Sequence, residues 1–175
     1  MNLSPINQTK LYGLENYLNE FVRLYKVNEL PNKILLSGLK GVGKCTLAYH
    51  LINYILSQKE DYSYNLTELT INDENKTFKL IQNGTCPNFN LIDVNSDKKN
   101  IDISQIRSLI INLNKSSFNS KPRFVLIDNI EYLNLFSANA LLKIIEEPND
   151  KLIFILIHNS SKKIINTIKS RCIVF

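Results

Sequence analysis

Short runs of apolar residues alternate along this chain with segments in which apolar residues recur every three or four positions. The runs predict β-strands, because they are apolar at nearly every position and are bounded by polar or proline-containing segments. They lie at residues 33–37, 89–94, 124–128, 152–157 and 172–175. Strands that are apolar throughout are typical of a parallel sheet that is buried on both faces.

The segments with helical spacing lie between these runs. They predict helices at residues 14–27, from 44 to about 57, from 103 onward, from about 137 to 146, and a short one that carries Ile164, Ile165 and Ile168. Pro148 is expected to end the fourth helix, and Ser160 or Ser161 to cap the last. The alternation predicts one α/β domain over residues 1–175, a doubly wound five-stranded parallel sheet with helices on both faces.

Residues 58–83 interrupt this alternation. They are polar and rich in asparagine, with isolated apolar residues. We expect an irregular insertion there, with a short helix at 77–82.

A glycine-rich loop follows the first predicted strand and leads directly into a helix. Its sequence, Gly38-Leu39-Lys40-Gly41-Val42-Gly43-Lys44-Cys45-Thr46, matches the phosphate-binding motif G-x-x-x-x-G-K-[ST] except at Cys45. The three glycines are expected to take positive φ values and to let the backbone approach a polyphosphate, with Lys44 reaching its β- and γ-phosphates. An ordinary glycine turn beside a lysine is the alternative.

Cys45 occupies the position at which a hydroxyl should ligate magnesium. A thiol is a soft ligand, and Mg²⁺ prefers oxygen. Thr46 has a hydroxyl, but it lies one residue further along the helix and is expected to point elsewhere. The sequence therefore also allows a nucleotide-binding loop that no longer binds magnesium.

Asp128 ends one predicted strand, and Asn159 lies just after another. Both are therefore expected at the carboxyl ends of the strands, where ligands bind in doubly wound sheets. Asp128 is placed like the carboxylate that holds a magnesium shell, although it could instead cap the next turn. Asn129 follows it where hydrolysing ATPases usually have a glutamate, and an amide cannot act as a general base. Glu131 is interpreted as a structural charge. Asn159 could contact a γ-phosphate.

Composition places the chain among globular proteins, with 175 residues, 44% of them hydrophobic and 21% charged. The net charge of +5 comes mainly from scattered lysines, which favours a solvated surface. A DNA-facing set is the alternative, made of Lys98, Lys99, Lys115 and Lys121. No signal peptide or membrane-spanning run is indicated, so we expect a cytoplasmic protein with no membrane partner. The three cysteines lie far apart, which argues against a disulfide framework.

Several segments together resemble a known family. They are Leu11–Glu15, Gly38–His50, Thr85–Phe89, Ile103–Arg107, Asn139–Pro148 and Ser170-Arg171-Cys172. From about Leu11 to its last residue, the chain resembles the amino-terminal AAA+ domain of bacterial DNA polymerase III clamp-loader subunits, above all the delta-prime subunits. The run ending at Pro148 and the Ser-Arg-Cys triplet are specific to this family, whereas the phosphate-binding loop is shared widely.

The resemblance implies a function in replication. Clamp loaders are five-subunit spirals that open a ring-shaped sliding clamp and place it on primed DNA, so the implied partners are the other subunits of a hetero-pentamer, the clamp and DNA. Arg171 would be catalytic in trans, on ATP held by a neighbouring subunit, an effect worth ~10³–10⁵ in rate. Asn159 matches the position that senses the γ-phosphate. Delta-prime subunits are typically stators that do not hydrolyse ATP.

Two departures from the family pattern also indicate a stator that does not hydrolyse ATP. Cys45 and Asn129 each remove a group needed for hydrolysis, so we expect weak ATP binding at most, a poor magnesium site and a stator role. Relatives carry a four-cysteine zinc module, but the 58–83 insertion contains no cysteine and Cys86 replaces a usual histidine, so we expect no zinc. Relatives continue into lid and collar domains, which are absent here. The chain is therefore expected either to be a fragment or to assemble through other surfaces.

Three alternatives remain open. The chain could be an ATP-hydrolysing motor subunit of the same loader, which would have to tolerate Cys45 and Asn129. A small P-loop kinase would need an arginine-rich lid, and the chain has only four arginines. Taken alone, Arg171 could be a surface arginine paired with a carboxylate.

Overall fold

The structure, a computed structural model, describes residues 4–95, 98–114, 119–146 and 151–175. The chain forms two compact units, each built from two stretches of sequence. Residues 1–30 and 43–87 make the first unit, and residues 31–42 and 88–175 make the second.

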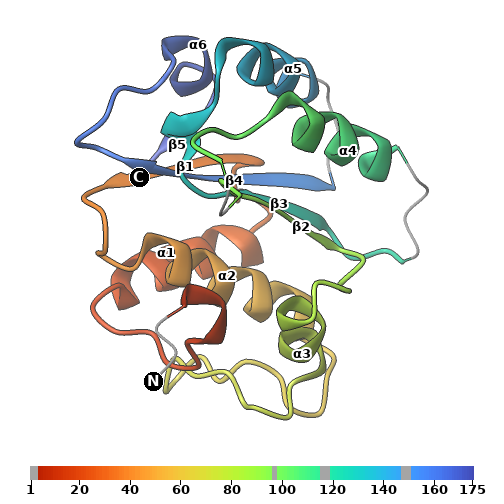
Figure 1. The fold of residues 1–175 in the computed structure, drawn as a ribbon. Coiled ribbons are helices and arrows are strands. Elements are labelled where there is room, and N and C mark those ends of the chain that lie inside the picture. Colours follow the sequence, from red (N-terminus) through yellow and green to blue (C-terminus); the bar gives the residue numbers. More distant parts are fainter. Residues whose placement is uncertain (1–3, 96–97, 115–118, 147–150) are drawn as a thin grey trace. The chain divides into compact units, whose positions relative to one another are not determined.

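The second unit contains the predicted sheet. Its strands are β1 (Lys33–Gly38), β2 (Phe89–Ile92), β3 (Arg123–Ile127), β4 (Leu152–Asn159) and β5 (Ile173–Val174). All the pairings are parallel, and the strand order is β2-β3-β4-β1-β5 (Figure 1). The predicted five-stranded parallel sheet is confirmed. The chain crosses from β1 to the far edge at β2 and then returns strand by strand, so β4 comes to lie beside β1.

Burial differs between central and edge strands. In β3 and β4 the apolar side chains are buried on both faces, as their unbroken hydrophobic sequences predict. At the edges, by contrast, Leu91 of β2 is 44% exposed, and Ile173 and Val174 of β5 are 54% and 45% exposed. An edge strand has a neighbour on one side only, so an apolar sequence there does not guarantee burial.

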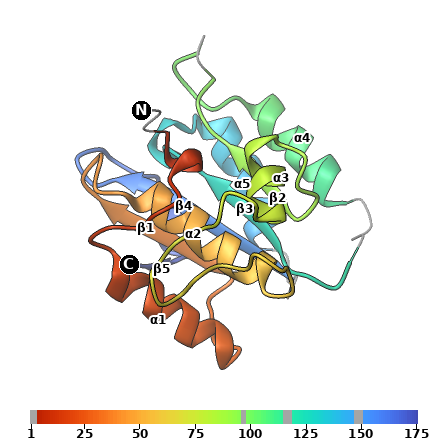
Figure 2. The same cartoon turned by 90° about the horizontal axis from the view of Figure 1, so that it is seen from below.

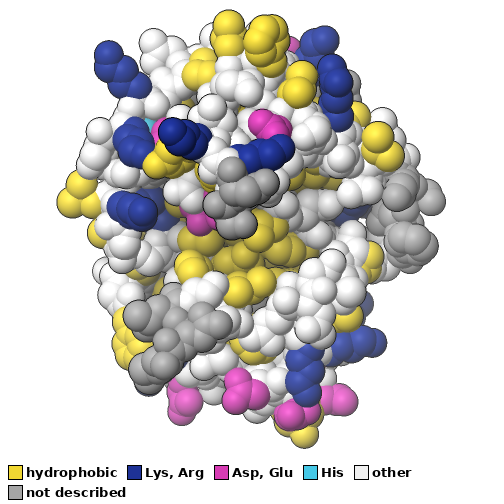
Figure 3. All heavy atoms as spheres, viewed as in Figure 1, with side chains coloured by type: hydrophobic (Ala, Val, Ile, Leu, Met, Phe, Trp, Pro, Cys, Tyr) yellow, Lys and Arg dark blue, Asp and Glu magenta, His cyan; other side chains and the backbone are white. Residues whose placement is uncertain are grey.

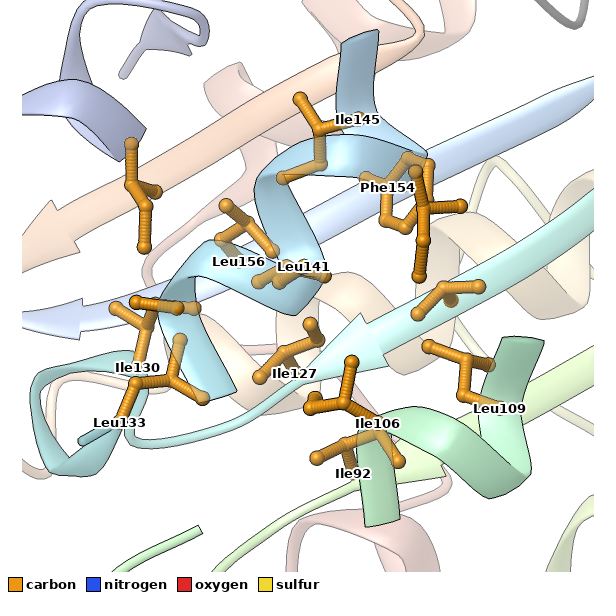
Figure 4. Packing of buried hydrophobic residues seen from close by; sticks show 14 of the residues in the cluster. Ile92, Ile106, Leu109, Ile127, Ile130, Leu133, Leu141, Ile145, Phe154 and Leu156 are labelled. Atoms are coloured by element: carbon orange, nitrogen blue, oxygen red, sulfur yellow. The ribbon is translucent and has the colours of Figure 1, made fainter. Parts of the chain in front are cut away.

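Helices α4 (Ile103–Leu113), α5 (Leu135–Glu146) and α6 (Asn166–Lys169) lie on one side of the sheet in the second unit (Figure 1). Their apolar side chains form a core with alternate residues of the strands (Figure 4). Leu141 and Ile145 of α5, Phe154 and Leu156 of β4, and Ile106 and Leu109 of α4 all belong to this core. Each such side chain contributes roughly 1.5–3 kcal/mol when fully buried.

Two predicted helix starts differ from the structure. The α5 helix begins two residues early, at Leu135, because the Asn134 Oδ1 accepts a hydrogen bond of 2.9 Å from the Ser137 N–H. The prediction that Ser160 or Ser161 caps the last helix is wrong: both lie in a turn in which Asn159 Oδ1 accepts from the Ser161 N–H at 3.1 Å. The α6 helix begins only at Asn166. Pro148, the expected stop of α5, lies outside the described residues.

The first unit is helical. It contains the 3₁₀ turn η1 (Pro5–Asn7) and the helices α1 (Glu15–Lys26), α2 (Lys44–Ser57) and α3 (Lys76–Gln82). The three elements α1, α3 and η1 all pack against α2 (Figure 2). The predictions of helices at 14–27, 44–57 and 77–82 are confirmed to within one residue at each end.

Buried polar groups organise the 58–83 insertion, which is less irregular than its sequence suggests. Asn75 is fully buried, and its Oδ1 accepts from the Phe78 N–H at 2.7 Å and from the Asn53 Nδ2 at 2.9 Å. Its own Nδ2 donates to the Tyr62 carbonyl at 2.6 Å. One asparagine therefore caps α3 and ties it both to α2 and to the loop before it.

His50 of α2 is also completely buried. Its Nε2 lies 3.1 Å from the carbonyl oxygen of Gln8, and its Nδ1 lies 2.8 Å from the Tyr64 hydroxyl. Since a carbonyl can only accept, Nε2 carries the proton and Nδ1 accepts from the hydroxyl. Burial lowers the pKa of His50 from 6.5 to about 4, and the bond to Gln8 opposes this shift only in part.

We expect the buried histidine to make stability fall on acidification. Above pH 6.5 the ring is neutral in both the folded and the unfolded chain. Between pH 6.5 and about 4 only the unfolded chain takes up the proton, so the free energy of unfolding falls across this window by about 3 kcal/mol in total. Urea unfolding at several pH values measures the slope. His50→Gln should remove this contribution to the pH dependence of the unfolding free energy, and His158→Gln should leave it in place. The same pH dependence in the natural chain and both variants would contradict the assignment of the effect to His50.

Candidate functional site

The polar residues that follow the strands share one edge of the second unit, because parallel strands present their carboxyl ends together. Gly38 ends β1 and pairs in register with Asn159, the last residue of β4. Asp128 follows β3, and its N–H donates to the Ile92 carbonyl at the end of β2 at 2.9 Å. The structure therefore brings Gly38, Asp128 and Asn159 to the same edge, as predicted.

The glycines of the loop differ in conformation. Gly41 and Gly43 have φ values of +88° and +90°, so two of the three expected positive values are confirmed. For Gly38 that expectation is wrong, because it is still part of β1 and its backbone is held in the ladder. A side chain at position 43 would also lie 3.3 Å from the Leu14 Cδ1. The backbone conformation therefore favours glycine at 43, and a Cβ there would also press on the Leu14 side chain.

The loop is shared between the two units. Residues 38–42 continue β1, with Leu39 61% and Val42 48% exposed. Gly43 is the N-cap of α2, and its carbonyl accepts from the Leu47 N–H at 2.9 Å. Lys44, Cys45 and Thr46 form the first helical turn and are half-buried. Their roles toward a nucleotide stay predictions.

Asn129 is held by two carboxylates. It has a left-handed conformation with φ +57°, and its N–H donates to Asp128 Oδ1 at 2.8 Å. Its Nδ2 donates to Asp93 Oδ1 at 2.8 Å, and that same oxygen accepts from the Val94 N–H at 2.6 Å. Asp93 is a residue that the sequence analysis missed. The repeated triplet Leu-Ile-Asp, at 91–93 and 126–128, was the available signal.

Glu131 supports the end of β4. It lies in the 3₁₀ turn η2 (Ile130–Tyr132), and its Oε2 accepts from the Asn159 N–H at 3.2 Å. This contact agrees with the interpretation of Glu131 as a structural charge. Within the described residues the Asn159 Oδ1 accepts from the Ser161 N–H, whereas the two N–H groups of its Nδ2 find no acceptor and remain for a ligand.

A buried histidine stiffens the same edge. The Nε2 of His158 lies 3.0 Å from the Lys162 carbonyl and its Nδ1 lies 2.9 Å from the Ser37 hydroxyl. Since the carbonyl can only accept, Nε2–H donates to it and the Ser37 hydroxyl donates to Nδ1 in the neutral ring. Ser37 and His158 are register partners, so this bond adds a side-chain link to the backbone ladder one residue before Gly38 and Asn159.

Arg171 lies at the opposite end of the strands, beside their amino ends. It precedes β5, whose residues Ile173 and Val174 pair with Ile34 and Leu35 near the start of β1. Its Nε donates to Glu146 Oε1 at 2.6 Å and its Nη1 donates to the Thr167 carbonyl at 3.0 Å. The pairing with a surface carboxylate, one of the two readings from sequence, is thus present. A role in trans stays a prediction.

Cys172, the neighbour of Arg171, is a poorly reactive thiol. Burial raises its pKa to about 11, although the nearby charge of Lys33 acts in the opposite direction. A thiol with this pKa carries little thiolate at neutral pH, so Cys172 acts in packing and not as a nucleophile.

The lysines do not form a continuous basic surface on the side shown in Figure 3. In the sheet-containing unit, Lys and Arg side chains lie in several separate places with carboxylates between them. Lys98 is paired with Asp102, and Lys115 lies outside the described residues. The described residues include no cluster of three or more His, Cys, Asp or Glu that could hold a metal ion, and none of their helices is long and apolar enough to cross a bilayer.

Solved structures share this fold. A DNA polymerase III gamma subunit-related protein from Thermotoga maritima has a TM-score of 0.61 at 20% identity, covering 89% of this chain and 44% of that one. The RuvB Holliday junction branch migration motor of Thermotoga maritima has a TM-score of 0.53 at 17% identity, covering 97% and 47%. The chain therefore shares the α/β fold of these proteins.

Sequence relatives give the family. The DNA polymerase III gamma subunit of Buchnera aphidicola subsp. Schizaphis graminum is 31% identical over 98% of this chain and 45% of that subunit. The delta-prime subunit of Buchnera aphidicola subsp. Baizongia pistaciae is 28% identical over 99% and 50%. The chain thus spans about half the length of these relatives. A family model described as "DNA polymerase III, delta subunit" matches residues 13–175. On this match, which covers most of the sequence, the chain belongs to the DNA polymerase III delta subunit family.

Proposed function

We propose that this chain is the AAA+ part of a clamp-loader subunit that helps to load a sliding clamp onto primed DNA. In this proposal it acts as a stator within a hetero-pentamer. It binds ATP weakly or not at all in its own site, and it donates Arg171 to the ATP site of a neighbouring subunit.

The observation that carries the proposal is the placement of Arg171. The phosphate-binding loop follows the carboxyl end of β1. Arg171 precedes β5, whose Ile173 pairs with Ile34, so Arg171 lies beside the amino end of β1. From Ile34 to Gly38 the strand spans about 13 Å, at about 3.3 Å per residue. An arginine at the amino edge is therefore poorly placed for phosphates beyond the carboxyl edge of its own sheet. It is well placed for a ligand carried by a neighbouring subunit.

The chain's own site supports the stator role. Magnesium does not fit the side chains present, because Cys45 offers a soft thiol where a hydroxyl is needed. A glutamate in place of Asn129 would bring a second carboxylate toward Asp93, to which the Asn129 amide now donates. The hydrogen-bonded arrangement around Asp93 therefore favours an amide that cannot act as a general base.

A second candidate is the ATP-hydrolysing motor subunit of the same assembly. The 31% identity to a protein named as a gamma subunit favours it. ATP hydrolysis separates the two candidates: a motor subunit hydrolyses ATP in its own site, whereas a stator loses nothing when Lys44 is replaced by alanine.

Contacts with the clamp and with DNA belong to the proposal as well. Of the DNA-facing set, Lys98 is paired with Asp102, Lys99 is exposed and Lys121 is half-buried. Because the set is small and dispersed, we expect it to assist DNA binding rather than to determine it.

The test of the proposed function is Arg171→Ala in the complete subunit, reconstituted with partner subunits, clamp and primed DNA. Removing a guanidinium that stabilises the transferred phosphoryl group should lower ATP turnover by the neighbouring site by about 10³-fold or more. Lys169→Ala, which removes an exposed cation two residues away, is the matched control and should leave turnover unchanged. Unchanged turnover in Arg171→Ala would exclude the donor role.

Cys45→Ser tests the degenerate nucleotide site. We expect the natural chain to bind ATP weakly and with little dependence on magnesium. The serine hydroxyl should make binding magnesium-dependent and roughly tenfold tighter, equivalent to about 1.4 kcal/mol. Calorimetric titration with and without magnesium measures both effects, with Cys86→Ser as the control. Tight, magnesium-dependent binding by the natural chain would contradict the prediction.

Asn129→Asp tests the contact with Asp93. Both side chains tolerate the left-handed backbone, but aspartate replaces the donor by a second carboxylate. We expect a loss of about 1–3 kcal/mol in the free energy of unfolding at pH 7. Asp93→Asn in the same chain should restore most of it, as measured by urea unfolding of both single variants and the double variant. Purely additive effects would show that the two residues are not coupled.

A further inference from the structure

Among the described residues, Glu146 supplies the carboxylate that pairs with the guanidinium of Arg171, and from this contact we infer that Glu146 is a positioning residue for the arginine finger. Glu146 fixes the Nε edge of the guanidinium and leaves its other nitrogens available to a phosphate on a neighbouring subunit. The inference rests on the proposed function, and it adds a second residue to the donor side of that site.

Two contacts determine the orientation of the guanidinium. Its Nε donates to Glu146 Oε1 at 2.6 Å, and its Nη1 donates to the Thr167 carbonyl at 3.0 Å. Glu146 is the last residue of α5, and Thr167 is the second residue of α6. Because the guanidinium is planar, anchoring two of its three nitrogens on two different helices prevents it from rotating.

The remaining donors fit an anionic ligand. A guanidinium has five N–H groups, and the two contacts engage two of them, which leaves three. Both hydrogens of Nη2 belong to these three and find no acceptor among the residues that the structure describes. The side chain is 39% exposed, so the group is accessible from solvent. An oriented pair of N–H groups is the arrangement with which arginine binds phosphate oxygens.

The position of Glu146 suggests that it serves the arginine and not the helix. A carboxylate at a helix C-terminus faces the negative end of the helix dipole, where Lys143 of the same turn is the favoured type of residue. The ion pair is also exposed, with Glu146 52% accessible, and exposed pairs of this kind contribute little to stability. A contact that is costly for its helix and of little value for the fold is best explained by the orientation of its partner.

The same pair could have the opposite effect, since a carboxylate can also hold an arginine back from a competing phosphate. The two effects predict opposite results when Glu146 is removed. A positioning residue lowers the turnover of the neighbouring site when it is lost, whereas a restraining residue raises it.

The experiment compares Glu146→Ala, Glu146→Gln, Arg171→Ala and the Glu146→Ala/Arg171→Ala double variant in the complete, reconstituted assembly. Misorientation of the guanidinium should lower kcat of the neighbouring site by roughly 10- to 100-fold in Glu146→Ala, with KM for ATP nearly unchanged. Glutamine can still accept the Nε–H bond without the charge, so Glu146→Gln should recover part of the loss. The double variant should be no slower than Arg171→Ala, because Glu146 acts only through the arginine.

Two controls separate orientation from folding. Thermal unfolding should give the same midpoint for Glu146→Ala as for the natural chain. Glu74→Ala removes another exposed ion pair, with Lys79, and should leave kcat unchanged.

The outcomes separate this inference from the proposed function. Unchanged or raised kcat in Glu146→Ala, together with a large loss in Arg171→Ala, overturns the positioning role alone. A double variant slower than Arg171→Ala overturns it too, because Glu146 would then act by another route. No effect of Arg171→Ala overturns the proposed function and this inference together.

Discussion

The parallel pairing of β1 with β4 is the interaction on which the arrangement of the second unit depends. Six consecutive residues of each strand are in register, from Lys33 opposite Phe154 to Gly38 opposite Asn159. The bond between Ser37 and His158 adds a partly buried side-chain link at the end of this ladder. Because β3 pairs with the other side of β4, the same register also determines where Asp128 lies. A shift of the β1–β4 register by one residue would move Gly38 relative to Asn159 and Asp128, and it would expose buried side chains.

A parallel sheet has two chemically different ends, and this chain has candidate functional residues at both. Its carboxyl edge carries the residues that resemble a nucleotide site, and its amino edge carries the guanidinium of Arg171. A subunit whose donor and acceptor surfaces are on opposite edges associates head to tail. Such contacts are heterologous, and they build rings or open spirals rather than twofold dimers. The direction of the strands is thus compatible with the proposed place in a spiral.

The fold was largely predictable from the sequence, because its signals are local. Unbroken apolar runs such as Leu152–Ile157 and the spacing of Leu141, Ile144 and Ile145 determine strands and helices independently of partners. Gly38 shows the limit of a motif: it belongs to the loop by sequence, but the β1 ladder fixes its backbone as extended. The start of α6 was mispredicted because Asn159 holds Ser160 and Ser161 in a turn, and the helix begins only at Asn166.

The contacts within the candidate site were much less predictable. The pairs Asp93–Asn129 and Glu146–Arg171 join residues that are 36 and 25 positions apart, and neither has a spacing that a sequence pattern could reveal. Both depend on which strand or helix end lies beside which, and this is known only once the strand order is known. The sequence thus singled out Arg171, Asn129 and Asp128 but not the more distant carboxylates of Glu146 and Asp93.

The order of strands also has a consequence for how the protein is made. During synthesis β1 leaves the ribosome long before β4, its partner 121 residues later at Ser37 and His158. Until then Ile34, Leu35 and Leu36, which are all buried in the finished sheet, have no strand to pair with. Long-range parallel pairing is slow to form, and unpaired apolar strands aggregate readily. In the nascent chain β1 is therefore an unpaired apolar segment until β4 has emerged.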